Sequence, residues 1–140
     1  MWTCPHCNKT FAKENQWHVC VNLPPEAALE GKAAILTTLF ESLLAQVQNF
    51  AEFQVSASTK AISLYASNHK TFLVLQPKKK WMDVLFFLDR EETEFPVFKV
   101  VPRSKTSWAH YVRLHDEEDL DAQLVRWIAE GHQAVLGRTG

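Results

Sequence analysis

Apolar residues recur at helical spacing near each end of the main part of the chain. Over residues 32–50 they form one stripe: Leu36, Leu39, Phe40, Leu43, Val47 and Phe50. Steps of three and four residues place such a stripe on one side of a helix. A second stripe lies in residues 116–136, at Leu120, Leu124, Trp127, Ile128 and Val135. Asp116 is its expected N-cap, and the acidic residues 117–119 suit the positive end of a helix dipole.

Short apolar or alternating runs fill the region between the two helical segments. They predict strands over residues 61–67, 71–76, 81–89, 98–101 and 108–114, separated by turn-like sequences. Residues 54–66 are also compatible with a partly helical segment. The connections are too short for crossover helices, which favours antiparallel pairing. We therefore predict an α+β fold, in which a helix from each end covers one face of an antiparallel sheet of about five strands.

The N-terminal residues are set apart from this domain by the sequence Leu23-Pro24-Pro25. We expect a zinc-finger-like segment at residues 1–22, a linker with a short helical turn at residues 23–31, and the α+β domain at residues 32–137. Gly31 is a plausible joint. A chain of 140 residues, 46% of them hydrophobic, can bury one ordinary core with a small appendage.

All three cysteines lie in the N-terminal segment, at a spacing typical of a zinc site. Cys4 and Cys7 form a C-x-x-C knuckle, and His18 and Cys20 can complete a tetrahedron. His6 is a weaker candidate for the histidine ligand. We predict one structural Zn²⁺ ion. The alternative is three free cysteines in a reduced protein; the odd count and the absence of a secretory signal argue against a disulfide framework.

The spacing of apolar residues around these cysteines resembles that of a C2H2-type ββα zinc finger. Phe11 matches the core aromatic, Trp17 the second apolar position, and Cys20 the third ligand. The fourth ligand departs from the finger pattern, because residues 22–25 contain no histidine. His18 replaces it only if the helix ends or tightens near Trp17, since residues two apart on a helix point in different directions.

The charge is nearly balanced overall but unevenly distributed. The net charge is −1, whereas residues 60–115 hold ten basic and five acidic residues and residues 116–140 hold two basic and six acidic residues. No global field therefore drives the chain to nucleic acid or to a membrane surface. No apolar run is long enough to span a bilayer and no targeting peptide is evident, so we expect a cytoplasmic protein without a membrane partner.

A lysine run opens one of the predicted strands and is a candidate nucleic-acid contact. Lys78, Lys79 and Lys80 precede Trp81, and basic side chains beside an aromatic ring are typical of phosphate and base contacts. Neighbouring strands could extend the patch with four more basic residues: Lys70, Lys99, Arg103 and Lys105. The alternative is a solvated turn whose lysines protect an edge strand from mispairing.

The strand at residues 108–114 offers a candidate ligand pocket and little sign of catalysis. Trp108, His110 and Val112 share one face, and Tyr111, Arg113 and His115 share the other. Trp108 and His110 could line a pocket, although an ordinary half-buried strand gives the same alternation. No nucleophile arrangement is evident, the His-x-Glu motif of zinc deaminases is missing, and four protein ligands would close a zinc site.

Most of the chain resembles an uncharacterised bacterial domain family. Members of that family are sometimes described as predicted transport proteins, and some lie beside restriction-like nuclease domains or begin with a Trp-x-Cys-Pro-x-Cys segment. The segments that carry the resemblance are residues 39–43, 74–80, 108–114 and 116–128. The resemblance spans about residues 39–134 and implies a small α+β module. Its nuclease neighbours suggest nucleic acid as a ligand.

These observations favour a non-catalytic zinc-binding protein that contacts DNA or RNA through the finger and the lysine run. A protein-interaction or self-association module is the alternative, with Trp2, Phe11 and Trp17 offered by the finger and zinc serving only to fold it. A third interpretation is a small-molecule or enzymatic site around His110. Each interpretation places the chemistry in a different part of the chain, so the arrangement of the strands bears on the choice.

Overall fold

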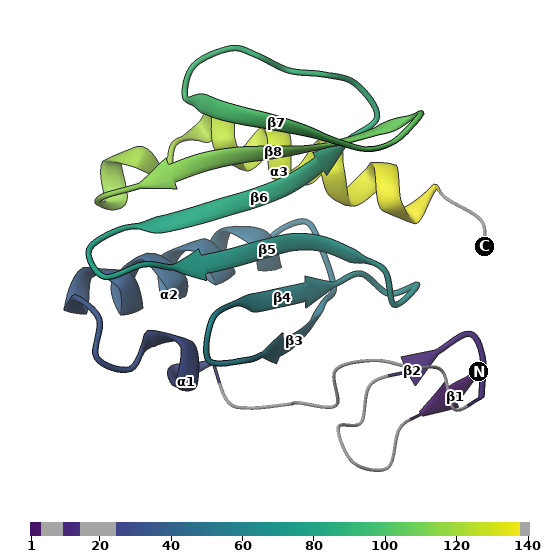
Figure 1. The fold of residues 1–140 in the computed structure, drawn as a ribbon, viewed down its shortest axis with the longest axis horizontal. Coiled ribbons are helices and arrows are strands. Elements are labelled where there is room, and N and C mark those ends of the chain that lie inside the picture. The colour runs from purple at the N-terminus through teal and green to yellow at the C-terminus, as the bar shows by residue number, and fades with distance from the viewer. Residues whose placement is uncertain (4–9, 15–24, 138–140) are drawn as a thin grey trace.

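The computed structural model describes residues 1–3, 10–14 and 25–137, which form a six-stranded sheet, its covering helices and a small hairpin (Figure 1). The elements of the main body follow one another in the order α1 (Glu26–Leu29), α2 (Ala34–Gln48), β3 (Gln54–Ala57), β4 (Ile62–Tyr65), β5 (Thr71–Pro77), β6 (Met82–Leu88), β7 (Val97–Ser104), β8 (Ser107–Leu114), the 3₁₀ turn η1 (Glu117–Asp119) and α3 (Ala122–Leu136). The predicted α+β class is confirmed.

The sheet is antiparallel throughout and has the strand order β3-β4-β5-β6-β8-β7. All five predicted strands are present, although β7 runs on to Ser104, beyond the predicted end at Val101. The sixth strand, β3, lies in the region that was also compatible with a helix. That helical alternative is wrong, because residues 54–57 pair with β4 and Val55 packs against the core.

Both long helices cover the same face of the sheet, as predicted. In Figure 1, α2 and α3 lie behind the strands. The stripe of α2 is buried at Leu36, Leu39, Phe40, Leu43 and Val47, and α3 packs against β5 and β6. Alternate residues of β6 point into this layer, and we call the face they belong to the inner face and its opposite the outer face. Met82, Val84, Phe86 and Leu88 are fully buried there.

The C-terminal helix begins later than the sequence suggested. Asp116 caps the short 3₁₀ turn η1, where its side chain accepts from the Glu118 N–H and the Asp119 side chain reaches back to the cap. The chain then becomes extended, and Asp121 caps α3 by accepting from the Leu124 N–H at 2.9 Å. The prediction of one helix from Asp116 was therefore wrong, because two successive acidic caps break the segment into two.

A glycine allows α3 to lie directly on the backbone of β6. A Cβ atom added at Gly131 would lie 2.8 Å from the carbonyl oxygen of Phe87, closer than side-chain carbons approach in real proteins. Any larger residue at this position would push the helix away from the strand. Gly31, by contrast, has a φ of 74° after α1, a left-handed conformation that glycine adopts without steric cost.

The N-terminal segment contributes the hairpin β1 (Trp2–Thr3) and β2 (Thr10–Phe11). The strands pair antiparallel, and Thr10 lines a small cavity together with Gln54, Tyr65 and His69 of the main body. The hairpin therefore lies beside the end of the sheet formed by β3 and β4. The predicted zinc ligands Cys4, Cys7, His18 and Cys20, and the alternative His6, lie outside the described residues.

Within the part of the chain that the structure describes, no helix has both the length and the apolar character needed to cross a membrane.

Candidate nucleic-acid interface

The outer face of the sheet is the one on which the predicted lysine run and several basic side chains meet. It faces the viewer in Figure 1, and no helix of the described residues covers it. Strand registers assign side chains to it: Asp83 pairs with Arg113, Leu85 with Tyr111, and Phe87 with Ala109. Because side chains alternate along a strand, these six residues lie on one face.

The lysine turn, defined as Lys78–Lys80, connects β5 to β6 and is held by its backbone. The Lys78 N–H donates to the Trp81 carbonyl at 2.8 Å, and the Ala33 N–H donates to the Lys79 carbonyl at 3.0 Å. The three lysines are exposed. Two backbone hydrogen bonds therefore fix where the turn lies, while the ammonium groups stay in solvent.

Arg113 links the lysine turn to the middle of the outer face. Its guanidinium lies over the Trp81 ring, 4.9 Å from the ring centroid, and over the Phe98 ring at 4.7 Å. Its Nε donates to Asp83 Oδ1 at 2.9 Å, and Asp83 is nearly buried, with 8% of its side chain exposed. The carboxylate thus orients the guanidinium between the two rings, which are the groups that a nucleic-acid base would stack on.

A bulge in β7 adds an aromatic ring to this face. Val97 pairs with Val112 and Lys99 with Tyr111, which leaves Phe98 as the extra residue. Two residues of a bulged strand oppose one residue of its partner, and the contacts put Phe98 beside Tyr111 with ring centroids 6.1 Å apart. Lys99 Nζ lies 5.0 Å from the centroid of the same Tyr111 ring. The bulge therefore gathers two rings and one ammonium group at the edge of the sheet.

A third pair of this kind lies farther along the same strands. The guanidinium of Arg103 lies over the Phe87 ring, 4.0 Å from its centroid. Arg103 occupies a second irregularity in β7, between the pairs Pro102–Trp108 and Ser104–Ser107. We call the whole set the cation–aromatic face, and it comprises Trp81, Phe87, Phe98, Lys99, Arg103, Tyr111 and Arg113.

The structure brings two of the four basic residues of the predicted patch extension onto the cation–aromatic face. Lys99 and Arg103 lie on the cation–aromatic face, as described above. Lys70 precedes β5 and Lys105 lies in the β7–β8 hairpin. The registers place both turns at the opposite end of the strands from the lysine turn, so the structure does not bring Lys70 and Lys105 beside it. Reading the sequence alone missed Phe98 and Arg113, although the alternation of Tyr111 with Arg113 was a usable signal.

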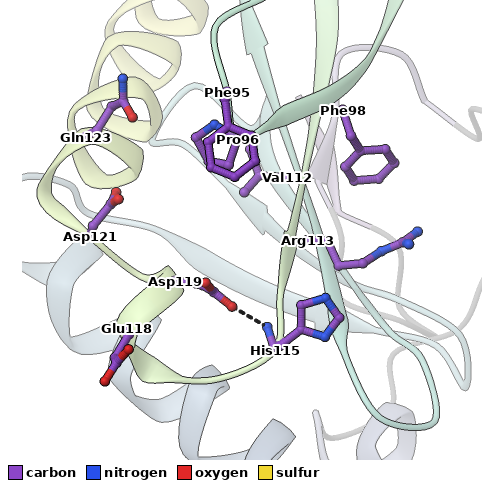
Figure 2. Close-up of a pocket in the computed structure, with 10 residues that line it drawn as sticks. All are labelled: Phe95, Pro96, Phe98, Val112, Arg113, His115, Glu118, Asp119, Asp121 and Gln123. Carbon is purple, nitrogen blue, oxygen red and sulfur yellow. Dashed lines mark hydrogen bonds between the residues drawn. The ribbon is translucent and has the colours of Figure 1, made fainter.

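A cavity of about 350 Å³ opens at the edge of the sheet beside the cation–aromatic face. Figure 2 shows Phe95 and Pro96 on one side of it and residues of η1 and α3 on the other. Two of its carboxylates are occupied as caps, because Asp119 accepts from the His115 N–H at 2.7 Å and Asp121 caps α3. Phe95 is 86% exposed and Phe98 is 48% exposed. The cavity is therefore acidic on one wall and aromatic on the other.

His110, predicted as part of a ligand pocket with Trp108, is buried on the inner face. Its Nε2 accepts from the Glu92 N–H at 2.8 Å, and its Nδ1 lies 3.0 Å from the Trp108 carbonyl, so that Nδ1 is the protonated nitrogen. The ring stacks on Phe86 with centroids 5.4 Å apart. Burial lowers the pKa of His110 from its ordinary value of 6.5. Both nitrogens are thus used within the fold, and neither His110 nor Trp108 lines the cavity of Figure 2.

A second buried histidine, His132, belongs to helix α3 and points toward the sheet. His132 of α3 packs edge-on against Phe72, with ring centroids 4.9 Å apart, and its Nδ1 has no hydrogen-bond partner among the described residues. Burial lowers the pKa of His132 from its ordinary value. The described residues contain no group of histidine, cysteine, aspartate or glutamate side chains arranged to hold a metal ion.

Comparison with known families and proteins gives one match. Residues 26–135 match the family described as "Domain of unknown function (DUF5655)". No curated protein and no solved structure matches the chain. The matched residues include the whole sheet and both long helices, as well as the region over which the sequence resembles an uncharacterised domain. The chain therefore belongs to the DUF5655 family.

Proposed function

We propose that this member of the DUF5655 family is a non-catalytic module that binds DNA or RNA and holds a structural Zn²⁺ ion in its N-terminal segment. The observation that carries the proposal is the continuity between the lysine turn and the arginine beside it. Trp81 follows the three lysines directly and stacks under Arg113. Positive charge next to exposed ring edges is the arrangement by which proteins contact a nucleic-acid backbone and its bases.

The distribution of charge on the outer face supports a polyanion as the ligand. Lys78, Lys79 and Lys80 lie at one end of the face, Arg113 contacts Trp81 next to them, and Lys99 lies over Tyr111 on the edge strand β7. Asp83 is paired with Arg113 and nearly buried, and the carboxylates of Glu118, Asp119 and Asp121 lie on the acidic wall of the cavity in Figure 2. A local positive field therefore remains on a chain whose net charge is −1, and such a local field attracts phosphate without a globally basic protein.

The test is a binding titration with fluorescently labelled oligonucleotides at several salt concentrations. Reversal of Lys78 and Lys80 to Glu should lower affinity by roughly tenfold or more at moderate salt and flatten the salt dependence, because fewer counterions are released. Reversal of Lys60 and Lys105 is the matched control, since both are exposed and the change in net charge is the same. Equal losses in the two variants would show a non-specific charge effect and refute the site.

The paired hairpin at the N-terminus supports the zinc part of the proposal. Trp2 pairs with Phe11 and Thr3 with Thr10, and Cys4 and Cys7 fall between these two paired strands in the sequence. A C-x-x-C pair in such a hairpin is the usual half of a structural zinc site. Cys4, Cys7, His18 and Cys20 would hold the ion, which would supply folding energy to the segment.

Native mass spectrometry tests the zinc site independently of nucleic acid. We expect one zinc ion per chain, lost when Cys20 is replaced by Ser. A Lys60→Ala variant, changed in an exposed lysine of the main body, serves as the control and should keep the ion. A chain purified without any metal, and with no uptake of added Zn²⁺, would leave the cysteines as free thiols.

A specific observation also favours the second candidate function, a protein-interaction or self-association module. Phe95 and Phe98 are exposed beside an acidic cavity wall, and exposed aromatic residues are enriched at protein interfaces. Replacement of Phe95 by Asp should abolish any self-association seen by sedimentation, and leave oligonucleotide binding intact if nucleic acid is the ligand of the outer face. Salt-insensitive self-association without oligonucleotide binding would favour this second function.

A further inference from the structure

The lysine turn by itself does not distinguish double-stranded from single-stranded nucleic acid, but the rings on the outer face do. Trp81 and Tyr111 are partly exposed and Phe98 is 48% exposed. A ring can stack only on a base whose face is free, and bases in a duplex already stack on one another. A set of exposed rings on a sheet therefore favours unpaired bases.

Each of these rings is already paired with a cation in the free protein. Lys99 lies over Tyr111 at 5.0 Å, and Arg113 lies over Trp81 and Phe98 at 4.9 and 4.7 Å. A flexible Lys side chain can leave the ring for a phosphate, because a cation–π contact at an exposed site is weak. The ring face is then open for a base. The Lys99–Tyr111 pair can therefore separate into a base contact and a phosphate contact, whereas Arg113 stays bonded to Asp83 and offers its remaining N–H groups to a phosphate.

The geometry of β7 and β8 brings these contacts into one row. Phe98 and Lys99 stand on the same face because of the bulge, and they flank Tyr111 from the neighbouring strand. Arg113 follows two residues after Tyr111 and reaches Trp81 at the lysine turn. The row runs from the edge strand β7 to the β5–β6 turn, and alternates ring and cation along its length.

The charge on this row matches a phosphate backbone. No ion pair of Lys99 is present among the described residues, and Asp83, the carboxylate that Arg113 contacts, is 8% exposed. An acidic protein partner would also fit the cations, and exposed aromatic residues occur at protein interfaces too, so oligonucleotide binding distinguishes the two ligands. The cavity in Figure 2 is lined by Phe98 and Arg113 as well as by its acidic wall, so a phosphate backbone would run along the outer face and not enter this cavity.

We infer that the outer face of the sheet binds single-stranded nucleic acid, with bases stacked on Tyr111 and Phe98 and phosphates held by Lys99, Arg113 and the lysine turn. This inference rests on the proposed function and specifies its ligand. It adds a binding surface on β7 and β8 to the contact at the lysine turn. Trp81, under Arg113, would be the ring nearest to that turn.

The experiment compares a single-stranded oligonucleotide with its own duplex, in DNA and in RNA, by fluorescence anisotropy. We expect the single strand to bind at least ~10-fold more tightly. Tyr111→Leu should weaken single-strand binding by about tenfold, because one stacking contact is lost, while leaving the weak duplex binding unchanged. Tyr65→Leu is the matched control: Tyr65 is a partly buried tyrosine of the outer face on β4, away from the row.

A second variant keeps the inference testable if Tyr111→Leu does not fold. Lys99→Gln removes one cation from an exposed position, and it should reduce the slope of log affinity against log salt by about 0.7 for a single strand. Equal binding of duplex and single strand, with no effect of Tyr111→Leu or Lys99→Gln, would overturn the inference and leave the lysine turn as a phosphate site. Absence of binding to any of the oligonucleotides would instead refute the proposed function itself.

Discussion

The two faces of the sheet are built from the same strands but are stabilised in different ways. On the inner face, Phe86 is fully buried between His110 and Trp127, in a layer covered by two helices. On the outer face, the Phe87 ring lies under the guanidinium of the exposed Arg103. Neighbouring residues of one strand thus lie in a packed core and under a charged side chain that solvent can reach.

This difference separates the residues that stabilise the fold, on the inner face, from those that are available to bind a ligand, on the outer face. Removal of any large side chain from the inner face leaves a cavity and lowers the stability of the fold, because protein interiors are close-packed. The outer face is held by long side chains that lie on rings and can move without disturbing the backbone. We therefore expect substitutions on the inner face to change stability, and substitutions on the outer face to change binding.

The largest effect should come from Phe86→Ala. The substitution removes a ring that contacts both His110 and Trp127 and leaves a cavity, at a cost of about 3–5 kcal/mol in the free energy of unfolding. Chemical denaturation measures it. Tyr111→Ala is the matched control on the outer face, with an expected loss of about 1 kcal/mol. Similar losses for the two variants would mean that the outer face is also a packed layer.

A smaller loss is expected from Gly131→Ala, which tests how closely α3 approaches β6. The new Cβ atom would lie 2.8 Å from the Phe87 carbonyl oxygen, and we expect a net loss of about 1–3 kcal/mol even though alanine favours the helix. Gly137→Ala is the control, because its Cβ atom would meet only ordinary contacts at 3.6 and 3.7 Å. An unchanged melting temperature for Gly131→Ala would show that the helix can shift outward freely.

The buried histidines should make stability depend on pH. Burial lowers the pKa of both His110 and His132 below the ordinary value of 6.5. At acidic pH the unfolded chain therefore binds more protons than the folded one. The stability that the neutral, buried histidines allow is fully present above about pH 6.5, and it decreases as the pH falls below that value. Thermal unfolding between about pH 7.5 and pH 5 measures this, since His titrates in that range.

A substitution can assign part of that pH dependence to one residue. His132→Leu keeps an apolar side chain against Phe72 and removes a buried nitrogen that has no partner among the described residues. We expect it to lose less stability on acidification than the unmodified chain. Gln133→Leu, at an exposed and non-titratable position of the same helix, is the control and should leave the pH profile as it was. A profile unaffected by His132→Leu would leave His110 as its source.

The inner face could be predicted from the sequence because periodicity follows burial. The stripe of α2 and the strands β5, β6 and β8 were predicted within a few residues, since each has apolar residues at the spacing of its element. The strand β3 was not, because four residues at a sheet edge carry too little pattern. The sequence predicts one cap at Asp116 where the structure has two, at Asp116 and Asp121, because no sequence signal marks the break at Leu120.

The outer face was harder to predict because its organisation depends on strand register. The lysine turn and Trp81 were visible as neighbours in the sequence, whereas Arg113 reaches Trp81 only through the pairing of β6 with β8. The bulge that exposes Phe98 depends on one unpaired residue, which no composition rule locates. The burial of His110 could not be predicted either, since its hydrogen bond to Glu92 comes from a distant loop. The zinc ligands stay a prediction from their spacing.

The smallest change in stability should follow Lys99→Gln, which tests whether a cation of the outer face contributes to the stability of the fold. Lys99 is exposed and its ammonium contributes one cation–π contact to Tyr111, so that its loss should cost no more than about 1 kcal/mol. A loss above about 2 kcal/mol would mean that this cation–π contact stabilises the fold. The small loss that we expect would mean that Lys99 is dispensable for folding and available to a ligand, which is the difference that separates the outer face from the inner one.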